Sequence, residues 1–254
     1  MDIMRNTFSL GFRDIDRSDR LTLAAAFDYF QEAAINHAEI LGVGRESMAQ
    51  TGQGWILSRM SVLMERRPKF QETVAVRSWP RGWEKLFALR DYDIRDESDT
   101  PIVRARSCWL IIDVEKRRPL RPQAVMNTLP LNEGIDALPS GAAGLEVRNN
   151  LVKTGERKAA YSDIDYNGHV NNARYIQWIQ DAVQPGLLEN AEKMRLDINY
   201  LNEIKPGEIT DILCTPLEEA GTFAFEGRKA DGAQAAFRAE LRLWPDRAGL
   251  DAGA

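Results

Sequence analysis

The sequence predicts an α+β protein made of two tandem copies of one fold, each with a long helix wrapped by an antiparallel sheet. Three observations support this prediction. The second half of the chain repeats the first, each copy has one apolar helical pattern followed by strand patterns, and a stretch of linker composition lies between them. A helix wrapped by a sheet supplies the buried face, so we expect it to be apolar around most of its circumference.

The repeat consists of two ungapped alignments of the chain with itself. Residues 14–33 align with 163–182, and residues 59–80 align with 195–216. The first alignment has six identities in twenty positions, whereas average composition gives roughly one in fifteen by chance. The two offsets, 149 and 136, differ by 13. We therefore expect a longer segment after the helix of the first copy, around 42–54.

In the first copy, apolar residues at helical spacing begin at Leu23 and end at Leu41, where Gly42 supplies a stop. Alternating or apolar stretches then predict four strands, at 55–65, 72–79, 86–95 and 102–113. The connection that follows contains four prolines and a Ser-Gly-Ala-Ala-Gly run. This composition is typical of a linker.

In the second copy, the helical spacing of Ala173, Ile176 and Ile179 predicts a helix. Asn171 or Asn172 is its expected N-cap, and Pro185-Gly186 its expected end. Four strands are predicted after it, at 195–202, 208–216, 221–229 and 234–244. The resulting organisation is a first domain at 1–115, a linker at 116–153, a second domain at 154–246 and a tail at 247–254.

Composition and charge exclude several classes of protein. The chain has 254 residues, a net charge of −5 and a pI near 5.3, which argue against a nucleic-acid partner. No apolar run approaches the roughly 20 residues that span a bilayer, and charged residues come too early for a signal peptide. We therefore expect a cytoplasmic protein with no membrane partner. Its two cysteines, Cys108 and Cys214, make no disulfide framework.

Histidine is too scarce for a multi-histidine metal site within one chain. His37 and His169 are the two histidines, and no HExxH or paired Cys/His spacing is present. The sequence also lacks a P-loop, a GxGxxG stretch and a GxSxG elbow. We expect no metal and no cofactor, and any enzymatic chemistry would depend on carboxylates, amides and an imidazole.

The segment 163–172 holds the candidate site. Asp165, Asn167 and His169 alternate just before a helix start, and in an extended segment they would project to one side. The unpaired amides and positive dipole end of the helix would lie beside them, as acyl transfer requires. Asn-Gly is also a common turn dipeptide, so spacing alone leaves a purely structural interpretation open.

The first copy serves as an internal control for this segment. Its equivalent positions hold Asp16, Ser18 and Arg20. The asparagine and the histidine therefore belong to the second copy alone. We expect a repeated scaffold with a single site.

DIDYNGHVNNARYIQWIQDA resembles the DxDxNxHVNNxxYxxW stretch of the acyl-acyl carrier protein thioesterases, the plant plastid type and its bacterial relatives. GWILSRMSVLMERRPKFQETVAVRSWP resembles the W-x-x-x-R…P…D/E-x-V-x-V-x-T/S-W pattern of the same family, and the likeness covers most of 8–244. The resemblance implies two hotdog folds in one chain, the first holding much of the acyl-chain pocket and the second the catalytic groups. It also implies hydrolysis of fatty acyl-acyl carrier protein, with release of a free fatty acid.

By position, the resemblance assigns catalytic roles to Asp165, Asn167 and His169. RLDINYLNEIKPGE resembles the strand where the family has a glutamate within a Y-R-R-E-C pattern, and Glu203 occupies that place. Ile204 replaces the cysteine of plant members, so no thiol nucleophile can act there. This difference favours direct attack by water.

The expected mechanism follows from the leaving group, a thiolate whose conjugate acid has a pKa around 8.5. Such a group departs near neutral pH without strong acid assistance. We expect His169 and Glu203 to polarise the water and Asn167 to hold either the water or the thioester oxygen. Asp165 would orient its neighbours near the helix amides.

Alternatives stay open at this stage. A hotdog hydrolase of coenzyme A thioesters would use an aspartate that maps to Asp165, and a non-catalytic acyl-binding module could keep the double fold. Basic residues of the connection could contact an acidic carrier protein or form a solvated linker; they are Lys116, Arg117, Arg118 and Arg121. His37 could touch the acyl cavity or be a core histidine. Acyl length and pairing into a homodimer are undetermined.

Overall fold

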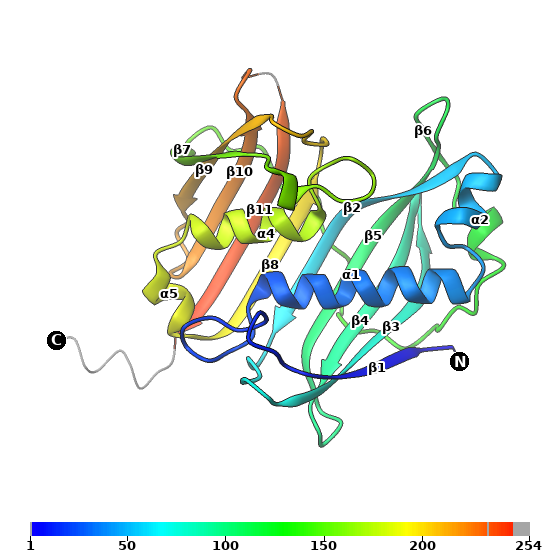
Figure 1. Ribbon diagram of the computed structural model, residues 1–254, viewed down its shortest axis with the longest axis horizontal. Coiled ribbons are helices and arrows are strands. Elements are labelled where there is room, and N and C mark those ends of the chain that lie inside the picture. The colour runs from blue at the N-terminus through cyan, green and yellow to red at the C-terminus, as the bar shows by residue number, and fades with distance from the viewer. Residues whose placement is uncertain (1, 233, 246–254) are drawn as a thin grey trace.

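The computed structural model describes residues 2–232 and 234–245, so the predicted tail at 247–254 lies outside the described residues. Strands of both copies form one continuous antiparallel sheet, and the two long helices lie on the same face of it (Figure 1). The strand order is β1-β3-β4-β5-β2-β8-β11-β10-β9-β7, with β6 paired to β5. The predicted α+β class is confirmed, because each half of the sheet wraps its own helix.

The first copy contains the predicted helix and four predicted strands, together with two elements that were not predicted. Its elements are β1 (Met4–Ser9), α1 (Leu23–Ile40), α2 (Arg45–Gln50), β2 (Gln53–Met64), β3 (Thr73–Glu84), β4 (Phe87–Arg95) and β5 (Pro101–Asp113). β1 was missed because it is an edge strand with one partner, β3. Only alternate residues of its MRNTFS sequence are half-buried, so its apolar signal is weak.

The second copy repeats this order. Its elements are β7 (Val152–Lys158), the short helix η1 (Tyr161–Asp163), α4 (Asn172–Asp181), α5 (Pro185–Glu189), β8 (Ala191–Tyr200), β9 (Ile209–Pro216), β10 (Thr222–Lys229) and β11 (Ala235–Pro245). β7 was not predicted, because its VKTGERK sequence is almost entirely polar. Pro185-Gly186 begins α5 instead of simply ending a helix, which suits a proline because the first helical position needs no N–H donor.

The two long helices differ in length. α1 has 18 residues and α4 has 10, so most of the additional residues expected at 42–54 lie instead in the last turns of α1. Ile40, which lies within the predicted apolar spacing of residues 23–41, is 71% exposed at the end of α1. Both helices begin with a side-chain cap, which was predicted for α4 and not for α1. Thr22 accepts the Ala25 N–H and Asn171 accepts the Ala173 N–H.

β2 and β8 join the two copies in an antiparallel pair. Ser61 lies opposite Asp197 and donates a hydrogen bond to its carboxylate. These two residues are equivalent at the offset of 136, so an approximate two-fold axis passes between them. The helices also meet, since the Gln180 side chain of α4 accepts the Ala24 N–H of α1 at 3.0 Å. The larger core cluster spans both copies between the helices and the sheet, and a second, smaller cluster lies at the far end of the first copy.

The connection between the copies has two short elements followed by an irregular segment. It contains β6 (Arg118–Leu120) and α3 (Gln123–Met126), and then it crosses the face of the sheet that the long helices leave free. Asp91 of β4 accepts the Ala137 N–H at 2.8 Å, and Asn199 of β8 accepts the Leu145 N–H at 2.8 Å. None of the helices in the described part of the chain is long and apolar enough to cross a membrane.

Candidate active site

The segment that carries the predicted residues is a tight turn, not the extended strand expected from its spacing. The Asp165 N–H donates to the His169 carbonyl at 2.9 Å, and the Gly168 N–H donates to the Asp165 carbonyl at 3.0 Å. Gly168 has φ +79°, a conformation that glycine adopts without steric cost. The Asn-Gly pair therefore forms a turn, and the predicted side chains are placed by hydrogen bonds instead of by strand alternation.

Asp165 orients Asn167 from within this turn. One carboxylate oxygen accepts the Asn167 backbone N–H at 2.8 Å, and the other accepts the Asn167 side-chain amide at 3.4 Å. Among the residues that the structure describes, the amide oxygen Oδ1 of Asn167 has no hydrogen-bond partner. The exposed Asn167 side chain is thus held at its nitrogen and free at its oxygen.

His169 pairs with Glu203, which comes from the loop after β8. His169 Nε2 lies 3.1 Å from Glu203 Oε2, with the two side chains 28% and 55% exposed. The Val170 N–H donates to the Ile204 carbonyl at 2.9 Å, so a backbone bond holds the two segments together beside this pair. In a neutral imidazole, donation from Nε2 leaves Nδ1 as the basic atom. The structure therefore joins the predicted residues as two pairs, Asp165–Asn167 and His169–Glu203.

The N-terminus of α4 is less open than expected for an oxyanion site. Asn171 caps it by accepting the Ala173 N–H on its side chain and the Arg174 N–H on its backbone oxygen, each at 2.9 Å. These two amides are already bonded. An oxyanion would need another donor, and the Asn167 side-chain amide in the preceding turn is one candidate.

The two cysteines are unsuited to nucleophilic attack. Burial raises the pKa of the Cys214 thiol to about 11 and also raises the pKa of Cys108, so both are protonated at neutral pH. Ile204, in the place of the family cysteine, is fully buried. Within the described residues, no group of three or more His, Cys, Asp or Glu side chains is placed to hold a metal ion.

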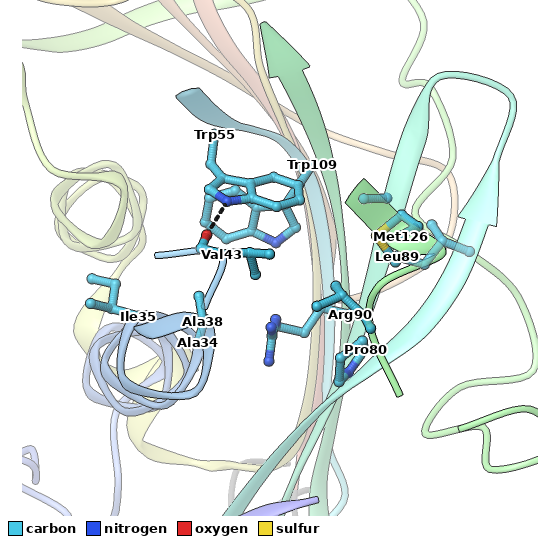
Figure 2. Close-up of a pocket in the computed structure, with 12 residues that line it drawn as sticks. Ala34, Ile35, Ala38, Val43, Trp55, Pro80, Leu89, Arg90, Trp109 and Met126 are labelled. Carbon is cyan, nitrogen blue, oxygen red and sulfur yellow. Dashed lines mark hydrogen bonds between the residues drawn. The ribbon is translucent and has the colours of Figure 1, made fainter. Parts of the chain in front are cut away.

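An apolar cavity lies in the first copy, between the last turns of α1 and the sheet (Figure 2). Its lining includes Ala34, Ala38, Val43, Trp55, Trp109 and Met126. The Trp55 indole donates to the Val43 carbonyl at 2.9 Å and so ties β2 to the loop after α1. None of the four predicted catalytic residues lines this cavity.

The loop after α1 also links the cavity to the polar turn. Two residues beyond Val43, the Arg45 guanidinium lies 4.3 Å above the ring of Tyr166, which belongs to the turn that carries Asn167 and His169. Such a cation–π contact contributes about 0.5–1 kcal/mol at an exposed site. One loop therefore borders both the cavity and the site, although the residues that form them come from different copies.

Two arginines were missed by sequence reasoning. Arg67, one residue before Pro68, is buried and donates to the Asp16 carboxylate and, at 3.0 Å, to the Leu21 carbonyl. Arg90 lines the cavity. It lies between Ala88 and Tyr92 at an inward position of β4, and a charged residue within that apolar alternation was the signal that could have revealed it.

His37 and the basic connection were left open by the sequence. His37 is 1% exposed and accepts from Arg90 at its Nδ1, 3.2 Å away. It therefore touches a lining residue without lining the cavity. Lys116 pairs with Asp113 at 3.2 Å on the surface, as expected for a solvated hairpin. Contact between these basic residues and an acidic carrier protein stays a prediction.

Comparisons with known proteins agree over nearly the whole chain. The model of the acyl-ACP thioesterase N-terminal domain matches residues 2–126, and that of the C-terminal domain matches residues 149–240. A chloroplastic palmitoyl-acyl carrier protein thioesterase of Cuphea hookeriana is 27% identical over 86% of this chain and 56% of its own length. The chain thus spans about half the length of the curated relatives it matches.

Two solved structures have the same architecture. An acyl-ACP thioesterase from Bacteroides thetaiotaomicron is 26% identical, with a TM-score of 0.84 over 95% of this chain and 98% of that one. A 12:0-ACP thioesterase from Umbellularia californica has a TM-score of 0.83 at 21% identity, over 96% and 98% of the two chains. The second likeness shows the fold alone, and both confirm the double hotdog arrangement.

Proposed function

Because the chain belongs to the acyl-ACP thioesterase family, we propose that it hydrolyses the thioester of fatty acyl-acyl carrier protein and releases a free fatty acid. The observation that carries this proposal is the His169–Glu203 pair, 3.1 Å apart beside an oriented Asn167. General-base catalysis of this kind typically contributes a factor of about 10² to 10⁴. Agreement of both halves with the family models supports the same conclusion.

In the proposed mechanism, water attacks the thioester carbonyl carbon and passes its proton to Nδ1 of His169. Glu203 accepts the Nε2 hydrogen bond and stabilises the imidazolium. Asn167, held by Asp165, positions the water through its Oδ1 or contacts the developing oxyanion through its amide nitrogen. Collapse of the tetrahedral intermediate breaks the carbon–sulfur bond, and the thiolate takes the proton from His169.

The acyl chain would occupy the apolar cavity of the first copy. This proposal is supported by the lining of the cavity and by the loop from Val43 to Arg45, which borders both the cavity and the polar turn. A fatty chain gains about 0.8 kcal/mol for each methylene that leaves water. Several buried methylenes would therefore supply much of the binding energy.

Carrier protein recognition, a cytoplasmic location and pairing into a homodimer are further parts of the proposal. The exposed basic residues near the β5–β6 hairpin support contact with an acidic carrier. Cell fractionation would test the location, and sedimentation of the purified chain would test the assembly. The curated plant relatives are named chloroplastic, which is a statement about those proteins.

The deciding experiment measures thiol release from acyl-carrier protein and acyl-coenzyme A substrates over a range of chain lengths. We expect hydrolysis of both, with a higher kcat/KM for the carrier protein thioester of the same length. Preference for the coenzyme A ester would instead support a coenzyme A thioesterase. Absence of thiol release from every substrate would overturn the proposal and favour a non-catalytic acyl-binding module.

A further inference from the structure

A buried cation with unused hydrogen-bond donors faces the apolar cavity. Arg90 is 9% exposed, lines the cavity, and extends from the sheet toward α1 (Figure 2). Its Nη1 donates to Ser78 Oγ at 2.9 Å and to His37 Nδ1 at 3.2 Å. Within the described part of the chain, Nε and Nη2 have no hydrogen-bond partner. The edge of the guanidinium formed by these two nitrogens is therefore free.

No carboxylate of the described residues neutralises this guanidinium. The adjacent Asp91 lies on the opposite face of β4, where it binds Arg106 at 2.6 Å. Asp2 lies beyond the imidazole, with its Oδ1 3.6 Å from His37 Nε2. Both partners of Arg90, a hydroxyl and an imidazole nitrogen, are neutral acceptors.

The state of His37 is set by the same arrangement. Burial and the Arg90 charge lower the pKa of His37. Nδ1 accepts from Arg90, so the proton of the neutral ring lies on Nε2, toward Asp2. His37 thus adds no second positive charge and helps hold the guanidinium in one orientation.

An unpaired arginine in an apolar cavity is costly, because arginine stays protonated in proteins and a buried charge requires compensation. The Nε–Nη2 edge is the planar fork that binds a carboxylate through two parallel hydrogen bonds. A plain methyl end placed against this edge would leave it unsatisfied. A chain with an oxygen acceptor at its distal end would satisfy it.

We propose that the cavity selects acyl chains with an oxygen acceptor near their distal end, either a carboxylate or a hydroxyl, which binds the free edge of Arg90. This inference rests on the proposed function for the identity of the ligand as an acyl group. It assigns Arg90 as a specificity-determining residue. Ser78 and His37 act as positioning residues that fix the guanidinium.

The test measures binding without turnover. Non-hydrolysable amide analogues of acyl-pantetheine are prepared in matched chain lengths with a methyl, hydroxyl or carboxylate end, and their Kd values are measured by calorimetry. At the length that reaches Arg90, we expect the oxygenated ligands to bind about 10- to 100-fold more tightly than the methyl ligand, as is typical of hydrogen bonds to a charged group. A carboxylate preference without a hydroxyl preference would show that charge dominates.

The matched variants are Arg90→Met and Arg104→Met. Arg104 lies on the neighbouring strand β5, and its 3.7 Å ion pair with Glu65 is on the surface. We expect Arg90→Met to abolish the preference for oxygenated ligands and Arg104→Met to retain it. Arg90→Lys, which keeps the charge but loses the fork, should weaken the carboxylate preference and provides a second test if Arg90→Met does not fold.

Equal affinity for all three ends in the wild-type protein, or the same preference in Arg90→Met, would overturn the inference. These results are distinguishable from failure of the proposed function. Binding preference without hydrolysis of the parent thioesters would contradict the function alone. Hydrolysis of plain thioesters without any oxygen preference would contradict the inference alone.

Discussion

The equivalent turns of the two copies have the same backbone and different chemistry. In each turn, an aspartate N–H donates to the backbone carbonyl of the residue four positions later. Asp16 donates to Arg20 at 3.0 Å, and Asp165 donates to His169 at 2.9 Å. A side chain from the loop after the first long strand reaches each turn. It is a cation after β2 in the first copy and an anion after β8 in the second. Arg67 and Glu203 occupy equivalent positions at the offset of 136.

The cation closes the first turn. Arg67 binds the Asp16 carboxylate and the carbonyls of Leu21 and Leu188, the latter at 2.9 Å. Leu188 belongs to α5 of the second copy, so Arg67 also holds the two copies together. Glu203, by contrast, is half exposed and contacts an imidazole. The residue at this one equivalent position, Arg67 or Glu203, therefore distinguishes a turn with a structural role from a turn that carries the candidate catalytic residues.

The two copies also differ in whether a cavity lies between the long helix and the sheet. The last turns of α1 carry Ala34 and Ala38 into the cavity, whereas α4 ends before reaching the equivalent place. In the second copy, Tyr175 of α4 packs edge-on against Tyr200 and Phe237 within the core. The first copy therefore provides a cavity, and the second copy provides the polar side chains.

The largest effect is expected for His169→Ala. Loss of the general base should lower kcat about 10²- to 10⁴-fold with an unchanged fold, measured by thiol release and circular dichroism. The matched control is Arg20→Ala, at the equivalent position of the first copy, which should retain most of the activity. Similar losses in both variants would contradict the separation of roles between the turns.

Replacing Arg67 by a neutral residue should affect stability, and replacing Glu203 by a neutral residue should affect catalysis. Arg67→Met leaves the Asp16 carboxylate without its buried partner and should reduce the free energy of unfolding by about 3 kcal/mol. Glu203→Gln should lower kcat and leave unfolding in urea nearly unchanged, because its side chain is exposed. A stable Arg67→Met protein, or an unstable Glu203→Gln protein, would show that the two turns are not specialised in this way.

Asn167→Ala should lower kcat about 10²-fold, as expected for loss of one donor or water-positioning group. Ser18→Ala, its counterpart in the first copy, should leave steady-state kinetics unchanged. Near-wild-type hydrolysis by both Asn167→Ala and His169→Ala would refute the catalytic assignments.

Filling the cavity should alter chain-length preference. Ala34→Leu adds three carbon atoms where α1 faces the cavity, and kcat/KM for the longest accepted chain should fall about tenfold, with shorter chains little affected. Ile40→Ala, at the exposed end of the same helix, is the control. A uniform fall for all lengths would indicate that the cavity does not hold the acyl chain.

The smallest expected effect is a pH dependence of stability from His37. Its lowered pKa means that the folded state binds this proton less readily than the unfolded chain, whose histidine has a pKa near 6.5. The stability that neutral His37 contributes is thus full above pH 6.5 and is lost as the pH falls toward its folded pKa. Between pH 7.5 and 5.5, wild type should lose more free energy of unfolding than His37→Gln, as measured by urea unfolding.

The sequence predicted the repeat, both long helices and eight strands, because these elements bury regular apolar patterns. It missed β1 and β7, which are edge strands with little apolar signal. It also placed the additional residues of the first copy after α1 instead of within it. Gly42 correctly marked the end of that helix, but the shorter extent of α4 depends on tertiary packing.

The candidate site was predicted by residue type more successfully than by geometry. The His169–Glu203 contact requires two segments separated by more than thirty residues, and only the family resemblance brought them together. The Asn-Gly pair indicates the tight turn, but spacing alone does not distinguish a turn from an extended segment. Arg67 and Arg90 could not be placed from composition, because their importance depends on burial and on which neighbours lack opposite charge.

The seam between the two copies, the antiparallel pair of β2 and β8, joins two hotdog units of one polypeptide. Two copies of a single-hotdog chain would dissociate on dilution and would carry identical turns. Here the seam lies within a single polypeptide, so its integrity does not depend on protein concentration. The two units can also differ in sequence at equivalent positions, so that the first copy has Arg67 where the second copy has Glu203.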